Sequence, residues 1–496
     1  MVSSHKALKS AVMLVGNGLA QKLIGLISTL VLARVLLPDD FALVAIATLV
    51  IMFIEVFTIT GSEQYILSQN SINRRILDSA WTLDIIVKSM ASLVAFSLAY
   101  PVSLLYENPS LTPILLSLGI MPLLTGLSNP GLWRLKRQQR YSLVVSIQVT
   151  GKVVGVITTI AIALSTKSYW ALIIGQLITT GSIFILSYAF CSYRPKLTLI
   201  HINKQYRFSS FMIGQELFGY LKSNIDTFFI SKSYSNTEFG NFHVMKYIAV
   251  IPSLSIMVPL AEPLLVEMSK NNSKVDERLF KYTVSFIALV LVAFPISLLM
   301  LAHSEFMVSL LLGMNWIDYH QILGFMGLLV TSFVIANHCK RALIIDRKTN
   351  FVFIYEFFAT LLVVISVVIN LEESVIRLVK ERVLIELLAV GVFLVVTSFL
   401  YLKANLVQFL LKIFPMMFGL ATFSLFYLWL LGILQAALSS LPISTAVSIL
   451  LFCFGYFVLL IIMFFGFYRR TREGIFIYSL IKKLFSSKRK LREDSN

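Results

Sequence analysis

Three lysines, Lys22, Lys152 and Lys222, stand near the middle of long apolar segments of the chain. A charge at the centre of a bilayer costs roughly 2.5–3.5 kcal/mol on insertion scales, so each such lysine needs an explanation. Structural ion pairs would place acids at a similar depth, whereas all three of these residues are cations. Lys22 and Lys152 therefore indicate a water-filled, electropositive cavity, which attracts anionic substrates. Lys222 leaves an alternative open, because Asp226 stands four residues later on the same helical face and can form an ion pair with it.

Polar side chains accompany these lysines in the same apolar segments. Asn17 and Gln21 give the first segment a polar stripe beside Lys22, and Gln215 occupies the position that corresponds to Asn17 in an internal repeat. We interpret all three amides as polar lining of the expected cavity. Arg34 stands near the end of the first segment, where a long side chain can reach the membrane surface, and we include it among the cationic substrate-binding residues.

Acidic residues stand at shallower positions than the lysines. Glu55, Glu216 and Asp226 lie inside the expected spans, where a partly desolvated carboxylate can carry a proton or bind Na⁺. They are candidate ion-coupling residues, and simple neutralisation of the lysines is the equally weighted alternative. Asp84 stands within about four residues of a span end, from which its carboxylate is expected to snorkel to the interface.

The elements that must position these residues are membrane-spanning helices. The chain of 496 residues is 57% hydrophobic and only 14% charged, whereas a soluble globular protein has about 25% charged residues. Apolar segments long enough to cross a bilayer number about 14, from Ala11–Leu37 at the start to Ser444–Tyr468 at the end. The predicted fold class is therefore an all-α polytopic membrane protein with about 14 transmembrane helices.

The positive charges determine the expected orientation in the membrane. Lys and Arg side chains gather in alternate loops, as the positive-inside rule requires of cytoplasmic loops. These cations include Arg134, Lys136, Arg137, Arg140, Arg194, Lys196, Lys204, Arg207, Lys340, Arg341, Arg347 and Lys348. We expect a multi-pass protein of the inner-membrane type with both termini in the cytoplasm. The net charge of +17 then reports topology and indicates no nucleic-acid partner.

A short motif occurs twice in the chain. Leu32–Arg34, followed by Phe41-Ala42, recurs in the second half as Ile230–Lys232, followed by Phe239-Gly240. Both copies begin at the same membrane face, so we predict a parallel repeat of two six-helix lobes around a central cavity, the usual geometry for alternating access. The expected parts are the lobes at 1–208 and 209–402, two additional transmembrane helices at 403–468 and a basic cytoplasmic tail at 469–496.

Enzymatic functions lack their usual motifs in this sequence. Gly151-Lys152 does not belong to a Walker A loop, because Ser146 replaces the first glycine and Val153 follows the lysine. The 3 cysteines form no Cys-x-x-Cys pair and the 6 histidines are scattered, so neither a metal centre nor a catalytic site is predicted. The expected outer loops are short, so the function must reside within or between the spans.

Several residues of the repeated motif resemble a known family signature. Val31–Arg34 followed by Phe41–Leu43 is similar to the motif at the first outer turn of polysaccharide-exporter (Wzx-type) flippases. Phe239-Gly240 and Leu312–Trp316 resemble matching features of the branch that exports O-antigen and colanic acid repeat units. The resemblance covers nearly the whole chain and implies the fold of the multidrug/oligosaccharidyl-lipid/polysaccharide exporter superfamily.

The resemblance also implies a function and its partners. The expected substrate is an undecaprenyl-diphosphate-linked oligosaccharide, moved from the cytoplasmic to the periplasmic leaflet of a bacterial inner membrane for O-antigen, capsule or exopolysaccharide synthesis. Lys22, Lys152, Lys222 and Arg34 would attract its diphosphate, which agrees with an electropositive cavity. Coupling to H⁺ or Na⁺ is implied without another cofactor. Membrane lipids, a polysaccharide polymerase and chain-length machinery are the implied partners.

Three other functions remain as alternatives. A cation-coupled multidrug extruder of the same fold would favour deep acids over deep lysines. A lipid-linked peptidoglycan precursor flippase would also use about 14 spans and a cationic cavity, because its substrate is a closely related anionic lipid. A membrane glycan polymerase or transferase would need a large outer loop for its chemistry.

Overall fold

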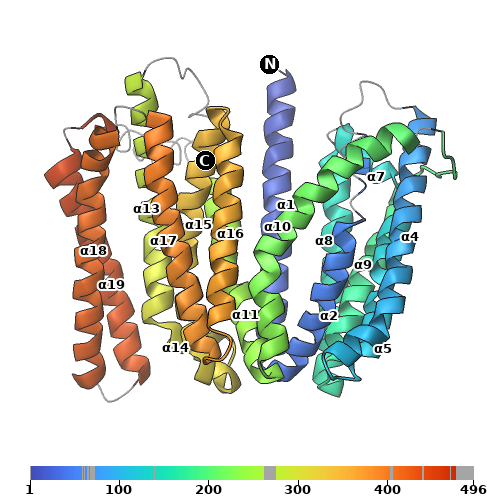
Figure 1. Ribbon diagram of the computed structural model, residues 1–496, viewed down its shortest axis with the longest axis horizontal. Coiled ribbons are helices and arrows are strands. Elements are labelled where there is room, and N and C mark those ends of the chain that lie inside the picture. The colour runs from blue at the N-terminus through green and yellow to red at the C-terminus, as the bar shows by residue number, and fades with distance from the viewer. Residues whose placement is uncertain are drawn as a thin grey trace, which may run out of the picture. The chain divides into compact units, whose positions relative to one another are not determined.

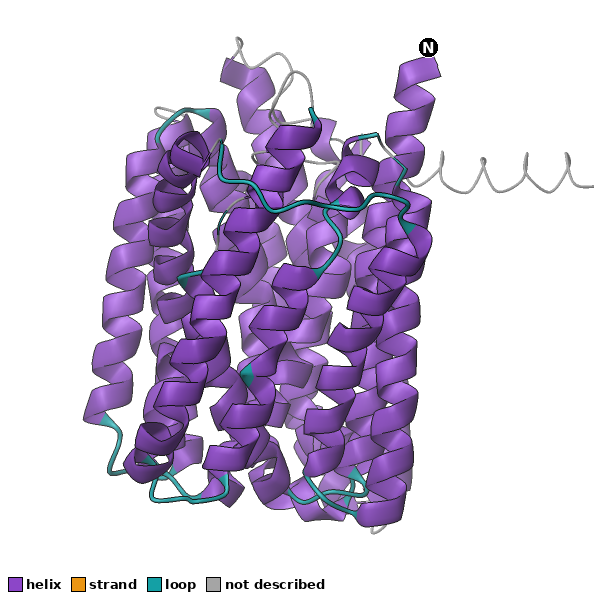
Figure 2. Cartoon of the chain, turned by 90° about the vertical axis from the view of Figure 1, so that its right-hand side faces the viewer, coloured by secondary structure: helices purple, strands orange, loops and turns teal. Residues whose placement is uncertain are grey.

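The structure of the chain, a computed structural model, describes residues 2–58, 60, 62–63, 66, 73–138, 140–200, 202–261, 275–402, 406–437, 441–469 and 471–475. Every regular element within these ranges is a helix (Figure 1, Figure 2). The prediction of an all-α fold is therefore confirmed.

Helices of 5 to 32 residues follow one another along the described chain. The first ten are α1 (Val2–Ala33), α2 (Pro38–Val56), α4 (Arg74–Leu105), α5 (Leu111–Leu118), α6 (Ile120–Leu127), α7 (Gly131–Arg137), α8 (Tyr141–Thr166), α9 (Trp170–Phe190), α10 (Ile202–Ser233) and α11 (Asn236–Pro252). They are followed by η1 (Ser253–Met257), α13 (Val275–Ala302), α14 (Ser304–Leu311), η2 (Met314–Tyr319), α15 (His320–Ile345), α16 (Thr349–Ile369), α17 (Val375–Leu402), α18 (Leu406–Ala437), α19 (Leu441–Met463) and η4 (Phe464–Tyr468).

Most of these helices can cross a membrane. In the described part of the chain, 11 are long and apolar enough, or 12 if the pair Leu111–Leu127 and Gly131–Arg137, which is bent by 57°, forms one span. α2 and α10 lie where two further spans were predicted, but they are not among these 11; α2, for example, is apolar overall but carries three acids, Asp39, Asp40 and Glu55, within its 19 residues. The polytopic membrane fold is confirmed, and helices lie at each predicted span position.

The two copies of the repeated motif start their following helices in the same way. Asp40 Oδ2 accepts a hydrogen bond from the backbone N–H of Leu37 at 2.9 Å, at the beginning of α2. Glu238 Oε2 accepts one from the backbone N–H of Ser235 at 3.1 Å, at the beginning of α11. In each case a carboxylate stabilises the positive end of the helix dipole. Corresponding residues of the repeat thus have the same local structure.

α8 and α9 lie side by side and pack through glycine residues (Figure 1). A Cβ atom at Gly155 would lie 1.8 Å from Thr179 Oγ1, and one at Gly151 would lie 2.5 Å from Ile183 Cγ1. Small residues at an interface let two membrane helices approach closely. The glycines on either side of Lys152 therefore serve helix packing, in agreement with the absence of a Walker A loop.

The helices form two compact units. Unit 1 comprises Met1–Met245, Leu311–Tyr319 and Val367–Val375, and unit 2 comprises Lys246–Leu310, His320–Ser366 and Ile376–Asn496. The bounds of these units come from the packing of the helices. The predicted six-helix lobes, the two additional helices and the basic tail were inferred from the sequence, and they stay predictions. Most of that tail, residues 476–496, lies outside the described residues.

An aromatic core holds unit 2 together where α13, α15 and α18 meet. The Tyr282 ring lies 4.4 Å from the His338 ring and 5.0 Å from the Phe409 ring, measured between centroids. The Tyr282 hydroxyl shares a hydrogen bond of 3.2 Å with Ser398 Oγ on α17. Burial of aromatic rings contributes a large apolar area at each position, so this core ties four helices of unit 2 to one another.

Candidate functional site

Three side chains, Asn17, Gln21 and Gln148, join α1 to α8 within unit 1, and we call them the amide cluster. Gln148 Oε1 accepts hydrogen bonds from Asn17 Nδ2 at 2.9 Å and from Gln21 Nε2 at 3.4 Å. Gln21 Nε2 also donates to Asn17 Oδ1 at 3.0 Å, across one turn of α1. All three side chains are half-buried. The structure thus brings the two predicted amides of α1 together at one polar contact with α8.

One of the predicted lysines, Lys152, stands beside the amide cluster, because it follows Gln148 by one turn on the same face of α8. Lys22 follows Gln21 directly on α1, and adjacent residues of a helix do not share a face, so its place in the site stays a prediction. Both lysine side chains are half-buried. Among the residues that the structure describes, no carboxylate pairs with the Lys152 ammonium group. A cation without such a partner, close to amide donors, can attract and bind an anion.

Gln148 was not among the residues predicted from the sequence. It precedes Lys152 by four residues, the same spacing that separates Asn17 from Gln21. A polar pair at this spacing in an otherwise apolar segment is the signal that would have identified it. The helix that Gln148 contacts, however, follows only from tertiary packing.

The other predicted cations and amides lie elsewhere in the chain. Arg34 follows the last residue of α1 and is exposed, about 18 Å along the helix axis from Lys22. The structure therefore does not bring Arg34 together with the amide cluster. The side chains of Gln215 and Lys222 on α10 lie outside the described residues, so their roles, and the ion pair of Lys222 with Asp226, stay predictions.

The three candidate ion-coupling acids occupy separate environments. Glu55 is half-buried near the end of α2, where the charge of Lys88 acts on it. Glu216 is exposed on α10, about 15 Å along that helix from Asp226. Asp226 is 1% exposed, and its Oδ1 accepts a hydrogen bond from the backbone N–H of Thr227 at 2.7 Å. Within the described ranges, no three His, Cys, Asp or Glu side chains are grouped so that they could hold a metal ion.

Asp84, which was expected to snorkel to the interface, is buried. It is 5% exposed, and its Oδ2 lies 2.9 Å from Lys88 Nζ. Its Oδ1 accepts a hydrogen bond from Thr60 Oγ1 at 2.6 Å. The expectation of a solvated carboxylate is wrong because α4 begins at Arg74, well before the predicted span, which places Asp84 about three turns inside the helix.

The motif residues gather at one end of unit 1 and pack against one another. Trp316 is fully buried, and its Nε1–H donates to the backbone carbonyl of Ala33 at 2.8 Å. The Trp316 ring meets Phe41 edge-on, with ring centroids 5.4 Å apart. A Cβ atom at Gly240 would lie 2.0 Å from the carbonyl oxygen of Pro38, so only glycine fits there. These motif residues therefore serve packing.

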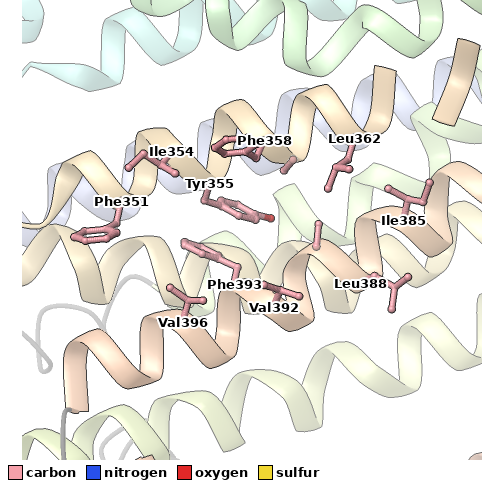
Figure 3. A pocket seen from close by; sticks show the side chains of 12 residues that line it. Phe351, Ile354, Tyr355, Phe358, Leu362, Ile385, Leu388, Val392, Phe393 and Val396 are labelled. Carbon is pink, nitrogen blue, oxygen red and sulfur yellow. The ribbon is translucent and has the colours of Figure 1, made fainter. Parts of the chain in front are cut away.

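Unit 2 contains an apolar groove of about 420 Å³ between α16 and α17 (Figure 3). The rings of Tyr355 and Phe393 stack within it, with centroids 3.7 Å apart. Apart from the Tyr355 hydroxyl, the side chains that line the groove are apolar. Such a groove suits hydrocarbon and offers nothing to a charged group. The polar candidate site is therefore the amide cluster with Lys152, and the predicted role of Lys22 stays a prediction.

Comparison with known sequences gives a consistent set of relatives. The profile of a family described as polysaccharide biosynthesis protein matches residues 31–321. The chain is 21% identical over 360 residues to the lipopolysaccharide biosynthesis protein WzxC of Escherichia coli K12, which covers 70% of this chain and 71% of that protein. It is 23% identical over 305 residues to the succinoglycan biosynthesis transport protein ExoT of Rhizobium meliloti, with 60% and 61% covered.

Two solved structures resemble the fold. The lipid II flippase MurJ in an inward closed conformation has a TM-score of 0.73 at 13% identity, covering 92% of this chain and 99% of that one. A multidrug resistance MATE family transporter of the MOP superfamily, in an inward-facing conformation, has a TM-score of 0.57 at 12% identity, covering 78% and 95%. At these identities the similarity establishes the fold.

Proposed function

Because the chain belongs to the family of polysaccharide biosynthesis proteins and is a transporter rather than an enzyme, we propose that it flips an undecaprenyl-diphosphate-linked oligosaccharide across a membrane. It is a multi-pass flippase of the multidrug/oligosaccharidyl-lipid/polysaccharide exporter superfamily. In the proposal, the oligosaccharide moves from the cytoplasmic to the periplasmic leaflet of a bacterial inner membrane. Both termini lie in the cytoplasm, and the product supplies O-antigen, capsule or exopolysaccharide synthesis.

The observation that carries this proposal is the environment of Lys152. Its ammonium group stands within the span formed by α8, half-buried, and pairs with no carboxylate in the described part of the chain. A charge at mid-membrane costs roughly 2.5–3.5 kcal/mol, so an unneutralised lysine there supports a water-filled site for an anion. The diphosphate is the strongly anionic part of the proposed substrate.

The proposed mechanism moves the head group through the electropositive site while the polyprenyl chain stays in the bilayer. Lys22 and Lys152 attract the phosphate oxygens, and the amide cluster offers hydrogen bonds that replace part of the hydration shell. Alternating access between two six-helix lobes then exposes the site to the other side. Coupling to H⁺ or Na⁺ through Glu55, Glu216 or Asp226, and contacts with polymerase and chain-length proteins, belong to the same proposal.

The alternatives differ in the charge of their substrates. A site built from lysines repels organic cations, which counts against multidrug extrusion. A lipid-linked peptidoglycan precursor carries a diphosphate too, so Lys22 and Lys152 serve both lipid substrates equally well. Vesicles that contain one lipid-linked glycan at a time distinguish these two functions.

The first experiment replaces Lys152 with alanine in a strain that lacks the native gene. Lys152→Ala should abolish surface polysaccharide, because the diphosphate loses its attraction to α8. Membrane insertion should stay at the wild-type level, and immunoblotting of the membrane fraction measures it. Staining of the surface polysaccharide measures function.

Lys167→Ala is the matched control at the end of the same helix. Lys167 follows the last residue of α8 and is exposed at its end, so its replacement should leave polysaccharide export intact. Full complementation by Lys152→Ala would contradict the proposed role of the electropositive site. Equal losses in both variants would point to a general effect of charge removal and contradict it as well.

A further inference from the structure

The side-chain amide of Gln148 is held in one orientation by two donors from α1. Its Oε1 accepts hydrogen bonds from Asn17 Nδ2 at 2.9 Å and from Gln21 Nε2 at 3.4 Å. Rotation of this amide alone by half a turn would place its NH₂ group against two other NH₂ groups, which cannot accept a hydrogen bond. α1 therefore holds the oxygen of Gln148 toward itself.

The amide nitrogen of Gln148 is left to donate elsewhere. Among the described residues, no acceptor takes a hydrogen bond from Gln148 Nε2. Lys152 stands one turn further along α8, and in the same described part its ammonium group donates to no carboxylate. An amide NH₂ has two donor hydrogens and an ammonium group has three. Together these two side chains present hydrogen-bond donors and positive charge.

The packing of α8 fixes which way this pair faces. Gly151 and Gly155 press against α9, where added Cβ atoms would lie 2.5 Å from Ile183 Cγ1 and 1.8 Å from Thr179 Oγ1. So close a contact leaves α8 little freedom to turn about its own axis. Gln148 faces α1, and Lys152, four residues later, lies on the same face of α8. One face of α8 therefore packs against α9, and another makes the polar contacts.

We propose that Gln148 and Lys152 form one anion-binding subsite on α8, in which the amide and the ammonium group donate to oxygens of a diphosphate. The inference rests on the proposed function, because that diphosphate belongs to the lipid-linked substrate. The subsite adds selectivity: a pair made only of donors binds phosphate oxygens and repels cations. Asn17 and Gln21 act through Gln148 as positioning residues, because they hold its oxygen away from the ligand.

The test measures binding of farnesyl diphosphate to the purified full-length protein in detergent, with neutral farnesol as the comparison. Gln148→Glu keeps an acceptor for the two α1 amides but replaces both amide donors with a carboxylate oxygen. We expect at least a ~10-fold loss of affinity for farnesyl diphosphate, which corresponds to about 1.4 kcal/mol. Farnesol should bind no differently in the two proteins.

Gln176→Glu provides the matched control, because it makes the same change at a half-buried position in the neighbouring helix α9. Its affinity for farnesyl diphosphate should equal that of the wild type. Gln148→Met removes the donors without adding charge, and it replaces the glutamate variant if that variant fails to fold. Asn17→Ala should weaken binding of farnesyl diphosphate when Gln148 is present and have no effect in the Gln148→Met protein. If Asn17 only stabilised the fold, its replacement would weaken binding equally in both proteins.

The inference is overturned if the wild-type protein binds no farnesyl diphosphate, if farnesol binds as tightly, or if Gln148→Glu binds the diphosphate like the wild type. Flipping of a lipid-linked oligosaccharide by wild-type proteoliposomes is measured separately and tests the proposed function. A protein that binds the diphosphate through Gln148 but flips no oligosaccharide would contradict the proposed function. The proposed anion-binding subsite of Gln148 and Lys152 would still be supported.

Discussion

At the scale of single residues, two kinds of charge occur inside the spans that the structure describes. Asp84 and Lys88 form an ion pair across one turn of α4, and Lys340 pairs with Glu356 between α15 and α16. Lys152 has no carboxylate partner in the described part of the chain. A paired charge is neutralised where it stands, whereas a cation without such a partner is available to a ligand. The difference in partners, rather than depth alone, therefore separates structural charges from the candidate site.

Asp84→Asn tests the structural group. The change should lower the free energy of unfolding by about 3 kcal/mol, because Lys88 keeps its charge in a poorly solvated place and loses the carboxylate that contacts it, with Glu55 as a more distant counter-charge. The Lys88 side chain is 23% exposed, which keeps the effect from being larger. Thermal unfolding in detergent, followed by circular dichroism, measures the change. The double variant Asp84→Asn/Lys88→Met should recover part of the loss.

Glu63→Gln is the comparison for this prediction. Glu63 pairs with Lys136 at 2.7 Å, and both side chains are partly exposed, at 33% and 22%. The Glu63 carboxylate is more exposed than that of Asp84, which is 7% exposed, so this pair should contribute less, about 1 kcal/mol. If the Asp84 and Glu63 variants lose equal stability, burial does not increase the contribution of the Asp84–Lys88 pair to the free energy of unfolding.

At the scale of elements, α8 uses one face for helix packing and another for polar contacts. Its glycine face packs against α9, and its polar face carries Gln148 and Lys152 and meets α1. Close helix packing in a membrane needs small residues, while a site for an anion needs polar ones. One helix can satisfy both needs because residues four apart share a face, so the two patterns interleave along it.

Gly155→Ala tests the packing face of α8. The new Cβ atom would lie 1.8 Å from Thr179 Oγ1 and 2.8 Å from the backbone carbonyl oxygen of Gly175, so the two helices must separate. We expect a loss of about 1–3 kcal/mol in the free energy of unfolding, measured by thermal unfolding in detergent. Gly181→Ala in α9 is the control, since nothing lies within 4 Å of the added atom. It should be neutral or stabilising by up to about 1 kcal/mol, because alanine favours the helix. Equal destabilisation by both variants would contradict the packing role.

At the scale of the whole molecule, unit 1 takes in two segments that lie far along the chain. Leu311–Tyr319 and Val367–Val375 belong to it, although the residues on either side of each segment belong to unit 2. The hydrogen bond from Trp316 to Ala33 spans 283 positions of the sequence. Tyr234 makes a similar link, since its hydroxyl donates to the backbone carbonyl of Glu373 at 2.8 Å. Late segments of the chain are thus needed to complete the first unit.

Trp316→Phe tests this long-range link. It keeps an aromatic ring against Phe41 but leaves the buried carbonyl of Ala33 without its donor, which should cost about 1–3 kcal/mol of stability. Trp429→Phe is the control, because Trp429 is 63% exposed on α18 and should change stability by less than about 0.5 kcal/mol. Thermal unfolding followed by circular dichroism compares the two. A Trp316 variant as stable as the Trp429 variant would show that the link contributes nothing.

The sequence by itself determined the helices, the membrane class and the presence of deep cations. Length and hydropathy of each apolar segment decide whether it can span a bilayer, and these are local properties of the chain. The spacing of Asn17 and Gln21 on one helical face was likewise readable, because helical periodicity is local. The motif around Phe41 and Trp316 could be recognised without any knowledge of what it contacts.

Only the tertiary structure decided which partner each polar residue has. Gln148 bonds to Asn17 across 131 positions of the sequence, and Thr60 completes the surroundings of Asp84 from another segment. Such contacts depend on which helices pack together and on their rotation about their axes, and no local pattern encodes either. Whether Lys152 is a neutralised structural charge or a cation that can bind a ligand follows from the same packing.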